Sequence, residues 1–491
     1  MSLLARKSIA ELQGEAGRGT LKRTLGPVNL TTLGIGSVIG TGIFVLTGAA
    51  ASQHAGPALV ISMVIAAVAC AFAGLCYAEL ASMIPVAGSA YTYAYATAGE
   101  IFAWIIGWDL ILEYALSTAT VAVGWSGYFV SFANDLGIHI PPRLTASPEV
   151  ALRMADGAVV NGVFNLPAAV IVLLVAGLLM IGIKESANTN TLLVLIKVGV
   201  LIVFVTAGFS YINRDNLTPF IPPNTGEFGS FGWSGVLRGA AIMFFAYVGF
   251  DAVSTAAQEA RNPQRDLPIG ILGSLAICTV IYIAVATVVI GIVPYRELNV
   301  PDPLAVGIDA TGLTWLSPVV KVSALFGLFS TMLVTLLGQT RIFYSMSRDR
   351  LLPDAFSRVH PRWRTPHVST AIVGVIVSVA AGLLPISVLS QLVSMGTLLA
   401  FVLVCAGVII LRRARPELPR PFRTPGMPWV PIVGAAVCLL QMVVLPAATW
   451  IRLVVWLAIG MAIYFLYSSR RTRGIRRMPA HAELPEEAPV A

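Results

Sequence analysis

The stretch that decides the fold is GIGSVIGTGIFVLTG, residues 34–48, which places five glycines inside an apolar run of membrane-spanning length. Glycine weakens helices, so we do not expect one continuous helix here. Lipid cannot hydrogen-bond free backbone groups, so unwound chain at membrane depth persists only where protein buries it or where it lines a cavity. A candidate binding site is therefore marked by Gly34, Gly36, Gly40, Gly42 and Gly48. For Gly34 or Gly48 alone, close packing of helices explains the glycine equally well.

The rest of the chain is also strongly apolar. Of its 491 residues, 57% are hydrophobic and only 11% are charged, and the mean hydropathy is +0.82. A membrane-spanning helix needs roughly 20 apolar residues. Twelve such segments lie near residues 27–51, 57–83, 101–132, 165–183, 188–209, 234–257, 268–293, 315–340, 368–386, 389–411, 429–446 and 449–468. The sequence predicts an all-α integral membrane protein with 12 transmembrane helices and no separate soluble enzyme domain.

Positive charge predicts the orientation of these helices. The first 24 residues lack the features of a removable signal peptide. With the N-terminus inside, 24 of the 32 Lys and Arg residues fall in inner segments and five in outer ones, which fits the excess of positive charge in cytoplasmic loops. We therefore expect both termini, residues 1–26 and 469–491, to be cytoplasmic. The net charge of +8 then reflects topology; contact with membrane lipid is left open, and nucleic-acid binding is not expected.

Several other kinds of site are not expected. All five cysteines lie within predicted spans, which argues against a structural disulfide. The five histidines form no cluster at metal-ligand spacing, and neither a nucleotide-binding P-loop nor a Gly-x-Ser-x-Gly elbow occurs in a strand context. We expect no metal, no cofactor and no enzymatic activity.

A second interruption is expected in the sixth segment, where a glycine and a carboxylate stand mid-span in Phe244-Phe-Ala-Tyr-Val-Gly-Phe-Asp251. Two broken segments at corresponding positions indicate an inverted repeat of five plus five helices with a site near the midplane. The repeats would be residues 27–209 and 234–411, with residues 429–468 as two extra C-terminal helices. Free N–H groups at one helix end and free carbonyls at another suit the carboxylate and the ammonium of an α-amino acid.

The chain resembles the cationic amino acid transporter branch of the amino acid, polyamine and organocation superfamily. The motifs that carry the resemblance are Gly36-Ser-Val-Ile-Gly-Thr-Gly-Ile-Phe44, the run Phe244 to Asp251 with Glu259-Ala-Arg-Asn-Pro263 downstream, and Gly338-Gln-Thr-Arg341 leading into Met346-Ser-Arg-Asp349. The resemblance covers roughly residues 20–470, and a small departure is Arg350, where relatives commonly have glycine. It implies a LeuT-type fold in which a bundle rocks against a scaffold.

Carried over residue by residue, the resemblance implies backbone contacts to the substrate. The carboxylate would meet N–H groups of Gly40, Thr41 and Gly42, and the ammonium would meet carbonyls of Val38, Phe245 and Val248. The predicted substrate-binding set is completed by Ile39, Tyr247 and Phe250. The Thr41 hydroxyl could also reach the carboxylate, or it could bond back within its own helix. Phe245 is the candidate for the aromatic side chain that closes the site.

Lys197 interrupts the apolar run of the fifth segment. A charge within the membrane is costly and marks a functional site by default, although snorkelling toward the cytoplasmic face is the alternative. The resemblance implies that this lysine takes the place of a sodium ion, bridging the first and eighth spans through the carbonyl of Gly36. Loss of its proton would release that carbonyl and couple transport to protons. A permanently charged lysine would instead give uncoupled exchange.

Other polar side chains are expected to shape the pocket. Asp109 and Glu113 lie one helical turn apart on the third segment. Glu113 could meet a cationic substrate side chain, relay protons or tie two helices together, and family alignment places Thr335 in the specificity pocket. Tyrosines at 91, 93 and 95 are expected to form an interfacial belt.

These features together predict a secondary active transporter that imports an L-amino acid by alternating access, coupled to protons, in a bacterial inner membrane. The substrate stays open between cationic amino acids, such as arginine, lysine or ornithine, and small neutral ones, such as alanine. An uncoupled exchanger and a receptor without transport are the alternatives. The sequence leaves open whether a small accessory membrane subunit takes part.

Overall fold

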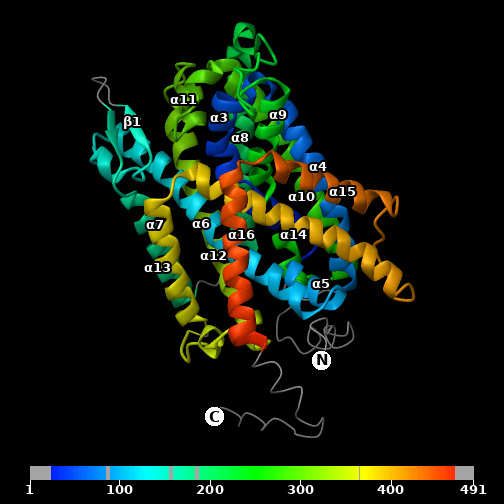
Figure 1. The fold of residues 1–491 in the computed structure, drawn as a ribbon. Helices are drawn as coiled ribbons and strands as arrows, with labels where there is room; N and C mark the ends of the chain where they lie inside the picture. The colour runs from blue at the N-terminus through cyan, green and yellow to red at the C-terminus, as the bar shows by residue number, and fades with distance from the viewer. Residues whose placement is uncertain (1–23, 85–88, 154–158, 183–186, 364, 470–491) are drawn as a thin grey trace, which may run out of the picture.

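The computed structural model describes residues 24–84, 89–153, 159–182, 187–363 and 365–469, and most of this chain is helical (Figure 1). Helices satisfy every backbone N–H and C=O within one segment, which is what lipid demands. The first half contains α2 (Pro27–Val38), α3 (Thr47–Ala50), α4 (Leu59–Met83), α5 (Ser89–Thr97), α6 (Glu100–Asp135), α7 (Leu166–Ile181) and α8 (Ala187–Gly208). The second half contains α9 (Gly232–Met243), α10 (Pro263–Ile292), α11 (Pro303–Asp309), α12 (Leu316–Arg348), α13 (His367–Leu383), α14 (Ile386–Ala414), α15 (Trp429–Val444) and α16 (Ala447–Ile463).

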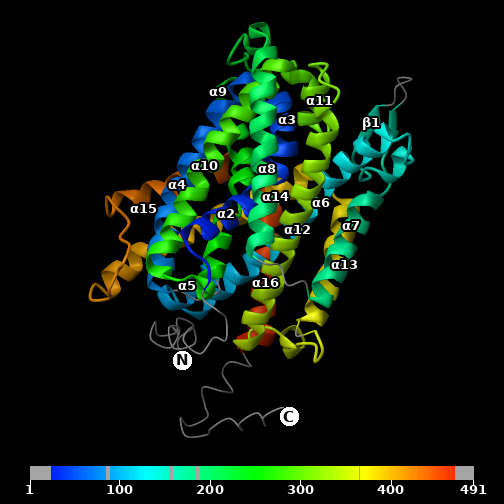
Figure 2. The ribbon, with the colours of Figure 1, turned by 180° about the vertical axis from the view of Figure 1, so that it is seen from behind.

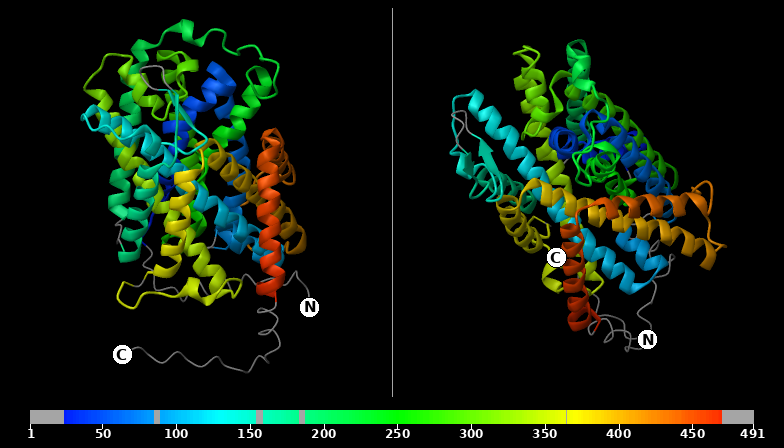
Figure 3. Two further views of the ribbon diagram at one scale, coloured as in Figure 1. Left: turned by 60° about the vertical axis from the view of Figure 1, so that its left-hand side comes forward. Right: turned by 45° about the horizontal axis from the view of Figure 1, so that its top comes forward.

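The helices have the length and surface of a membrane protein. Among the described residues, eight helical stretches are long and apolar enough to cross a membrane, and α7, α13 and α15 are shorter apolar helices. One of the eight, Gly42–Met83, joins parts of two predicted segments, so the count of twelve stays a prediction. The outer helices α15 and α16 (Figure 3) expose large apolar side chains such as Val443, Ile451 and Val454. An apolar surface of this kind is stable against lipid rather than water.

The centre of the molecule is the pair α6 and α12, which cross closely because glycines face large side chains. A Cβ added at Gly107 of α6 would meet the Sδ of Met346 at 2.8 Å, and one added at Gly338 of α12 would meet the Cε1 of Tyr114 at 2.6 Å. Both contacts join the first half of α6 to the second half of α12, as expected for an antiparallel pair, and they show small residues allowing close helix approach. Because Glu113 lies on α6 and Thr335 on α12, the packing of this pair sets their positions relative to each other.

One end of the molecule carries a small antiparallel hairpin of β1 (Ala151–Arg153) and β2 (Val159–Asn161), with Leu152 opposite Val160. The short helix α11 lies at the same end (Figure 1). The segment leading into α11 packs on the second half of the first span, because a Cβ at Gly48 would collide with the carbonyl of Leu298. Gly48 therefore allows close packing, which is the alternative to a binding role that the sequence left open for it.

Helix α5 lies at the opposite end from the hairpin (Figure 1) and corrects one expectation. Its three tyrosines do not form an interfacial belt, since Tyr91, Tyr93 and Tyr95 are only 2%, 1% and 7% exposed. Tyr91 donates a hydrogen bond to Oδ2 of Asp349 at 2.6 Å, and Tyr95 donates to Oε2 of Glu100 at 3.3 Å. Protein covers this helix on several sides, which the spacing of the tyrosines did not indicate.

Candidate functional site

The expected interruption of the first span is present. Helix α2 ends at Val38, and Ile39 has an extended backbone with φ −72° and ψ 96°. The chain becomes helical again at Thr41 and continues as a π-helical turn, η1 (Gly42–Leu46). π-Helical turns often occur at functional sites. Figure 2 shows α2 among α8, α10 and α12, so the break lies inside the molecule.

The sixth span is interrupted at the corresponding place. After α9 come a 3₁₀ turn, η7 (Phe244–Tyr247), an extended Val248 with ψ 132°, and a second 3₁₀ segment, η8 (Phe250–Glu259). Gly249 has a φ of 120°, which side chains other than hydrogen rarely allow. Glycine therefore permits the change of direction at this point.

The two breaks touch each other. A Cβ on Gly42 would fall on the Cα of Ala246, and a Cβ on Gly249 would lie 2.9 Å from the carbonyl of Ser37. Only glycine permits this approach of backbone to backbone, which makes these two glycines structural requirements of the site. Gly34 has a different role, because a Cβ there would meet the side chain of Ser274 at 2.5 Å. Gly34 is a helix-packing residue.

Several backbone carbonyls at the breaks already accept hydrogen bonds. The Val38 carbonyl accepts from the Tyr282 hydroxyl at 2.8 Å, and the Phe245 carbonyl accepts from the Val248 N–H at 3.2 Å. A carbonyl oxygen has two lone pairs, so each can accept a further bond. The Thr41 hydroxyl is buried and has no hydrogen-bond partner within the described chain, so it does not bond back within its helix. A buried hydroxyl without a partner is uncommon and points to an absent ligand or water.

Lys197 lies beside the first break rather than at the membrane surface. Its side chain is 1% exposed, and its Nζ donates to the carbonyls of Gly36 at 3.1 Å and Ile39 at 3.3 Å. A third bond, to the Thr331 hydroxyl at 3.1 Å, reaches α12. The expected link from the fifth span to the first and eighth spans is therefore present, and snorkelling of the lysine toward the surface is excluded.

Acidic and polar side chains from α6, α12 and η8 lie near the breaks. Glu113 is 3% exposed, and its Oε2 has no partner in the described part of the chain. Tyr114 points its hydroxyl at Oδ2 of Asp251, 3.5 Å away. Thr335 is half-buried and accepts a hydrogen bond from the Thr118 hydroxyl at 2.9 Å. These groups could meet the side chain of a ligand whose two ends are held at the breaks.

Three aromatic residues of the predicted set point in different directions. The Tyr247 hydroxyl donates to the Met63 carbonyl at 3.2 Å, so its ring packs against α4 and not into a cavity. The Phe250 ring packs on Tyr77 and Phe401. Phe245 is 5% exposed at the break itself, where an aromatic side chain can close the site.

The sequence did not single out four residues that support the first break. They are Tyr282, Thr331, Tyr128, whose hydroxyl donates to the Phe44 carbonyl at 2.8 Å, and Gly124, where a Cβ would meet the Thr41 side chain at 2.7 Å. All four come from helices distant in sequence. A tyrosine or threonine in an apolar helix carries no signal of its partner, so these residues could be found only in the fold.

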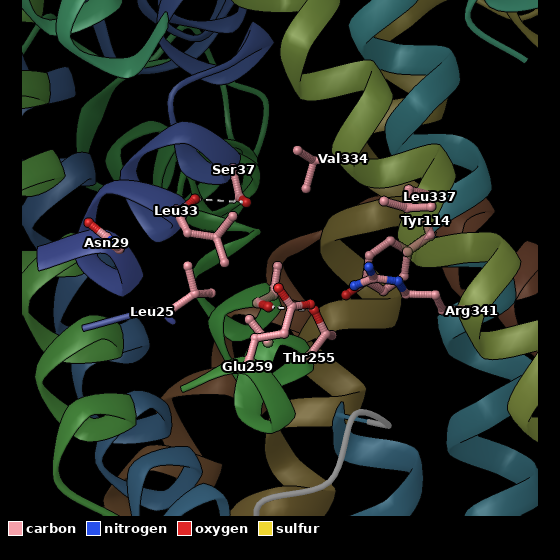
Figure 4. A pocket seen from close by; sticks show the side chains of 13 residues that line it. Leu25, Asn29, Leu33, Ser37, Tyr114, Thr255, Glu259, Val334, Leu337 and Arg341 are labelled. Carbon is pink, nitrogen blue, oxygen red and sulfur yellow. Dashed lines mark hydrogen bonds between the residues drawn. The ribbon is translucent and has the colours of Figure 1, made fainter. Parts of the chain in front are cut away.

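A cavity of about 170 Å³, which we call the α2–α12 cavity, begins beside the breaks (Figure 4). It is lined by Leu25, Asn29, Leu33 and Ser37 of the first span and its approach, by Ala252, Thr255, Ala256 and Glu259 of η8, and by Tyr114, Val334, Leu337, Gly338 and Arg341. Ser37, next to Gly249, closes the end nearest the breaks. Arg341 is exposed at the other end, so the cavity gives access to the breaks from the face where α2 begins.

Two other classes of site receive no support in the described residues. No group of three or more His, Cys, Asp or Glu side chains in that part of the chain could hold a metal ion. The five cysteines are buried, and no two of them form a disulfide.

Comparison with known proteins gives a consistent family assignment. A family model described as amino acid permease matches residues 25–467. The chain is 46% identical over 476 residues to the branched-chain amino acid permease of Bacillus subtilis, covering 96% of this chain and 99% of that protein. It is 45% identical over 471 residues to the methylthioribose transporter of the same organism, with 96% and 99% covered. It is 38% identical over 418 residues to the vacuolar cationic amino acid transporter 4 of Arabidopsis thaliana, covering 85% and 68%.

Proposed function

The chain belongs to the amino acid permease family, and from this premise we propose that it imports an L-amino acid by proton-coupled alternating access. The family and its transporter relatives make it a multi-pass membrane transporter rather than an enzyme. Our proposal adds the direction, the coupling ion and the residues that bind the substrate.

The contact between the two broken spans is the observation that carries the proposal. Gly42 lies against Ala246 and Gly249 lies against Ser37, so half-helix ends from both spans meet inside the protein. Half-helix ends of opposite polarity suit the two charged groups of a zwitterion. The unpartnered hydroxyl of Thr41 supports a ligand at this point. We assign the carboxylate to Gly40, Thr41 and Gly42, and the ammonium to carbonyls of Val38, Phe245 and Val248.

The wider architecture is part of the proposal. We assign residues 27–209 and 234–411 to two inverted repeats of the LeuT type, residues 429–468 to two further spans, and both termini to the cytoplasm. Membership of the cationic amino acid transporter branch and a bacterial inner membrane follow from the same resemblance. The paired interruptions after Val38 and at Gly249 support the repeat, because they fall in corresponding spans of the two units.

The substrate side chain is the least constrained part. The buried carboxylates of Glu113 and Asp251 favour a cationic side chain, whereas the relative named as a branched-chain amino acid permease favours an aliphatic one. A relative of nearly equal identity is named as a methylthioribose transporter, so this sugar derivative belongs in any substrate panel.

Coupling is assigned to Lys197 through its bonds to Gly36 and Ile39. A protonated lysine holds both carbonyls of the first span against α12, and a neutral lysine lacks the charge that strengthens these bonds. Protonation would therefore favour one of the two access states. If the lysine stays charged throughout the cycle, the protein is an uncoupled exchanger instead.

Uptake into proteoliposomes tests the proposal directly. Purified protein should accumulate radiolabelled L-amino acids, and an inward proton gradient should increase that accumulation. Competition by arginine, lysine, ornithine, alanine, leucine and methylthioribose identifies the substrate. Binding without uptake would identify a receptor, and uptake that ignores the gradient would identify an exchanger.

A further inference from the structure

Two motifs that carry the family resemblance take no part in the contact between the breaks. Glu259, at the end of η8, begins Glu259-Ala-Arg-Asn-Pro263, and Arg341 of α12 ends Gly338-Gln-Thr-Arg341. The fold brings both side chains to the walls of the α2–α12 cavity, on opposite sides of it (Figure 4). Their chemistry therefore concerns whatever occupies that cavity.

The two side chains are the only charged groups among the residues that line the cavity. Glu259 is half-buried and Arg341 is exposed. Within the described ranges, neither side chain forms a salt bridge with the other or with any other residue, so more than 4 Å separates the two charges. Opposite charges held apart across a cavity form a receptor for a molecule that carries both charges itself.

The other polar side chains of the lining are the Asn29 amide and the hydroxyls of Ser37, Thr255 and Tyr114, of which the Tyr114 hydroxyl points at Asp251. The hydroxyls of Ser37 and Thr255 donate to carbonyls of their own helices, at 3.1 Å and 2.7 Å. The walls between the charges are apolar and include Leu33, Val334 and Leu337. A neutral polar ligand would find few donors here, whereas an aliphatic side chain would find an apolar surface.

The cavity size fits this class of ligand. Its volume of about 170 Å³ slightly exceeds the roughly 150 Å³ of an apolar cavity known to take benzene. An aliphatic amino acid has a few more heavy atoms than benzene and can leave one end in the open mouth near Arg341. A larger solute such as a peptide would not fit.

We propose that the α2–α12 cavity is a second, weaker amino acid site, in which Arg341 binds the carboxylate and Glu259 binds the ammonium. This inference rests on the proposed function, because its ligand is the transported substrate. Ser37 lines the cavity and also touches Gly249 at the breaks, so the second site adjoins the first along one path. A substrate released from the breaks passes between the two charges before it leaves the protein.

Equilibrium binding to the purified full chain tests the second site. We would measure radiolabelled L-leucine, with L-arginine and L-alanine in parallel, over a wide concentration range. The wild-type protein should bind in two components. Arg341→Gln and Glu259→Gln should each weaken the weaker component at least about tenfold, as expected for loss of one charge-assisted hydrogen bond, and should leave the tighter component in place. Arg341→Lys should retain most of the weaker component.

Matched controls separate the site from general effects of charge. Arg348→Gln removes an exposed guanidinium from the same helix, where it lies over Tyr344, and Glu417→Gln removes an exposed carboxylate, so both should keep two components. A single component in a wild-type protein that transports would overturn the second site. The exchange of charges, Glu259→Arg together with Arg341→Glu, gives a second contradicting outcome. If this double variant binds ligand in one component but regains uptake, the two residues form an ion pair that closes the cavity and do not bind substrate. Absence of both binding and uptake in the wild type would contradict the proposed function instead.

Discussion

Lys197 and Lys321 are the two lysines that the structure describes, and they differ in what they hold. Lys197 bonds Gly36, Ile39 and Thr331 around the first break, whereas Lys321 forms an ion pair with Asp135 at 2.6 Å. Replacing Lys197 by Ala leaves these buried acceptors without their charged donor. We expect uptake to fall at least about tenfold and the remaining uptake to lose its dependence on pH, measured in proteoliposomes between pH 5 and 8.

The control for this change is Lys321→Ala, which removes the other buried ammonium group, that of a lysine on α12. Its partner Asp135 is 43% exposed and can return to water, so we expect uptake to keep its pH dependence. Transport by Lys197→Ala with the wild-type pH profile would show that the lysine does not couple protons.

Thr335 provides a prediction about substrate size. It is half-buried, and its hydroxyl contacts Thr118 of α6 at 2.9 Å. Methionine at this position would add bulk to the pocket, so we expect uptake of large amino acids to fall more than tenfold relative to alanine. The same substitution at Thr206, which is exposed on α8, should leave the substrate range unchanged. Equal uptake of large and small amino acids by Thr335→Met would place this residue outside the pocket.

For single residues, the sequence was informative where the polarity of a side chain differed from that of its segment. Lys197 in an apolar helix predicted a polar partner, and the family resemblance identified that partner as Gly36; both agree with the structure. Tyr282 and Thr331 are ordinary residues of membrane helices, so nothing local predicted their bonds to Val38 and Lys197. Pairwise contacts between distant helices depend on packing, which periodicity does not encode.

Between elements, the contact of the two broken spans is the most sensitive point. An Ala at Gly42 would place its Cβ on the Cα of Ala246, and backbone cannot move aside as a side chain can. We expect Gly42→Ala to lower stability by about 1 to 3 kcal/mol, the usual cost of overpacking, and to reduce uptake more than tenfold. Thermal unfolding in detergent and proteoliposome uptake measure the two effects.

Gly177 on α7 is the matched control, because nothing lies within 4 Å of a Cβ added there. Alanine favours a helix over glycine by about 1 kcal/mol, so Gly177→Ala should be neutral or slightly stabilising. Wild-type uptake by Gly42→Ala would mean that the spans do not need this close contact.

A second element-level prediction concerns the tie between α4 and α14. Glu79 is 1% exposed and accepts from Nε and Nη2 of Arg412 at 2.9 and 2.6 Å. The Arg412 side chain is 22% exposed. Its removal leaves the buried carboxylate of Glu79 with only the Thr424 N–H and the nearby Arg420 as partners. We expect Arg412→Ala to cost about 2 kcal/mol, seen as a lower unfolding temperature.

The exposed pair of Arg415 and Glu417 is the control for this prediction. Its atoms are 3.8 Å apart and its side chains are 65% and 61% exposed, so Arg415→Ala should cost less than about 0.5 kcal/mol. Equal losses of unfolding free energy for Arg412→Ala and Arg415→Ala would show that the Glu79–Arg412 ion pair does not stabilise the fold.

The elements themselves were more predictable than their contacts. Glycine content located both breaks, because helix interruption is a local property. The buried helix α5 was missed, since its tyrosine-rich sequence fits an interfacial position as well as an interior one. The π-helical turn after Thr41 was also beyond the sequence, because it depends on how the first span packs around Gly124 and Ala246.

For the molecule as a whole, composition identified a membrane protein, and the charge counts of the loops predict its orientation. Loop labelling can test it, because the five native cysteines are buried and should give little background. Val159 on β2 and Val359 beyond α12 are 64% and 45% exposed, and five of the twelve predicted spans separate them. An odd number of crossings places them on opposite sides. Val28, 70% exposed at the start of α2, should share the side of Val359.

We therefore expect Val159→Cys to react with a membrane-impermeant maleimide in intact cells, and Val28→Cys and Val359→Cys to react only after the cells are permeabilised. Each variant should retain amino acid uptake, which shows that it is inserted as the native protein is. Labelling of Val159 and Val359 from the same side would contradict the twelve-span arrangement. Labelling of Val28 and Val359, but not Val159, in intact cells would keep the span count and invert the orientation. In that case the α2–α12 cavity would open to the outside, and substrate would pass Arg341 and Glu259 on entry.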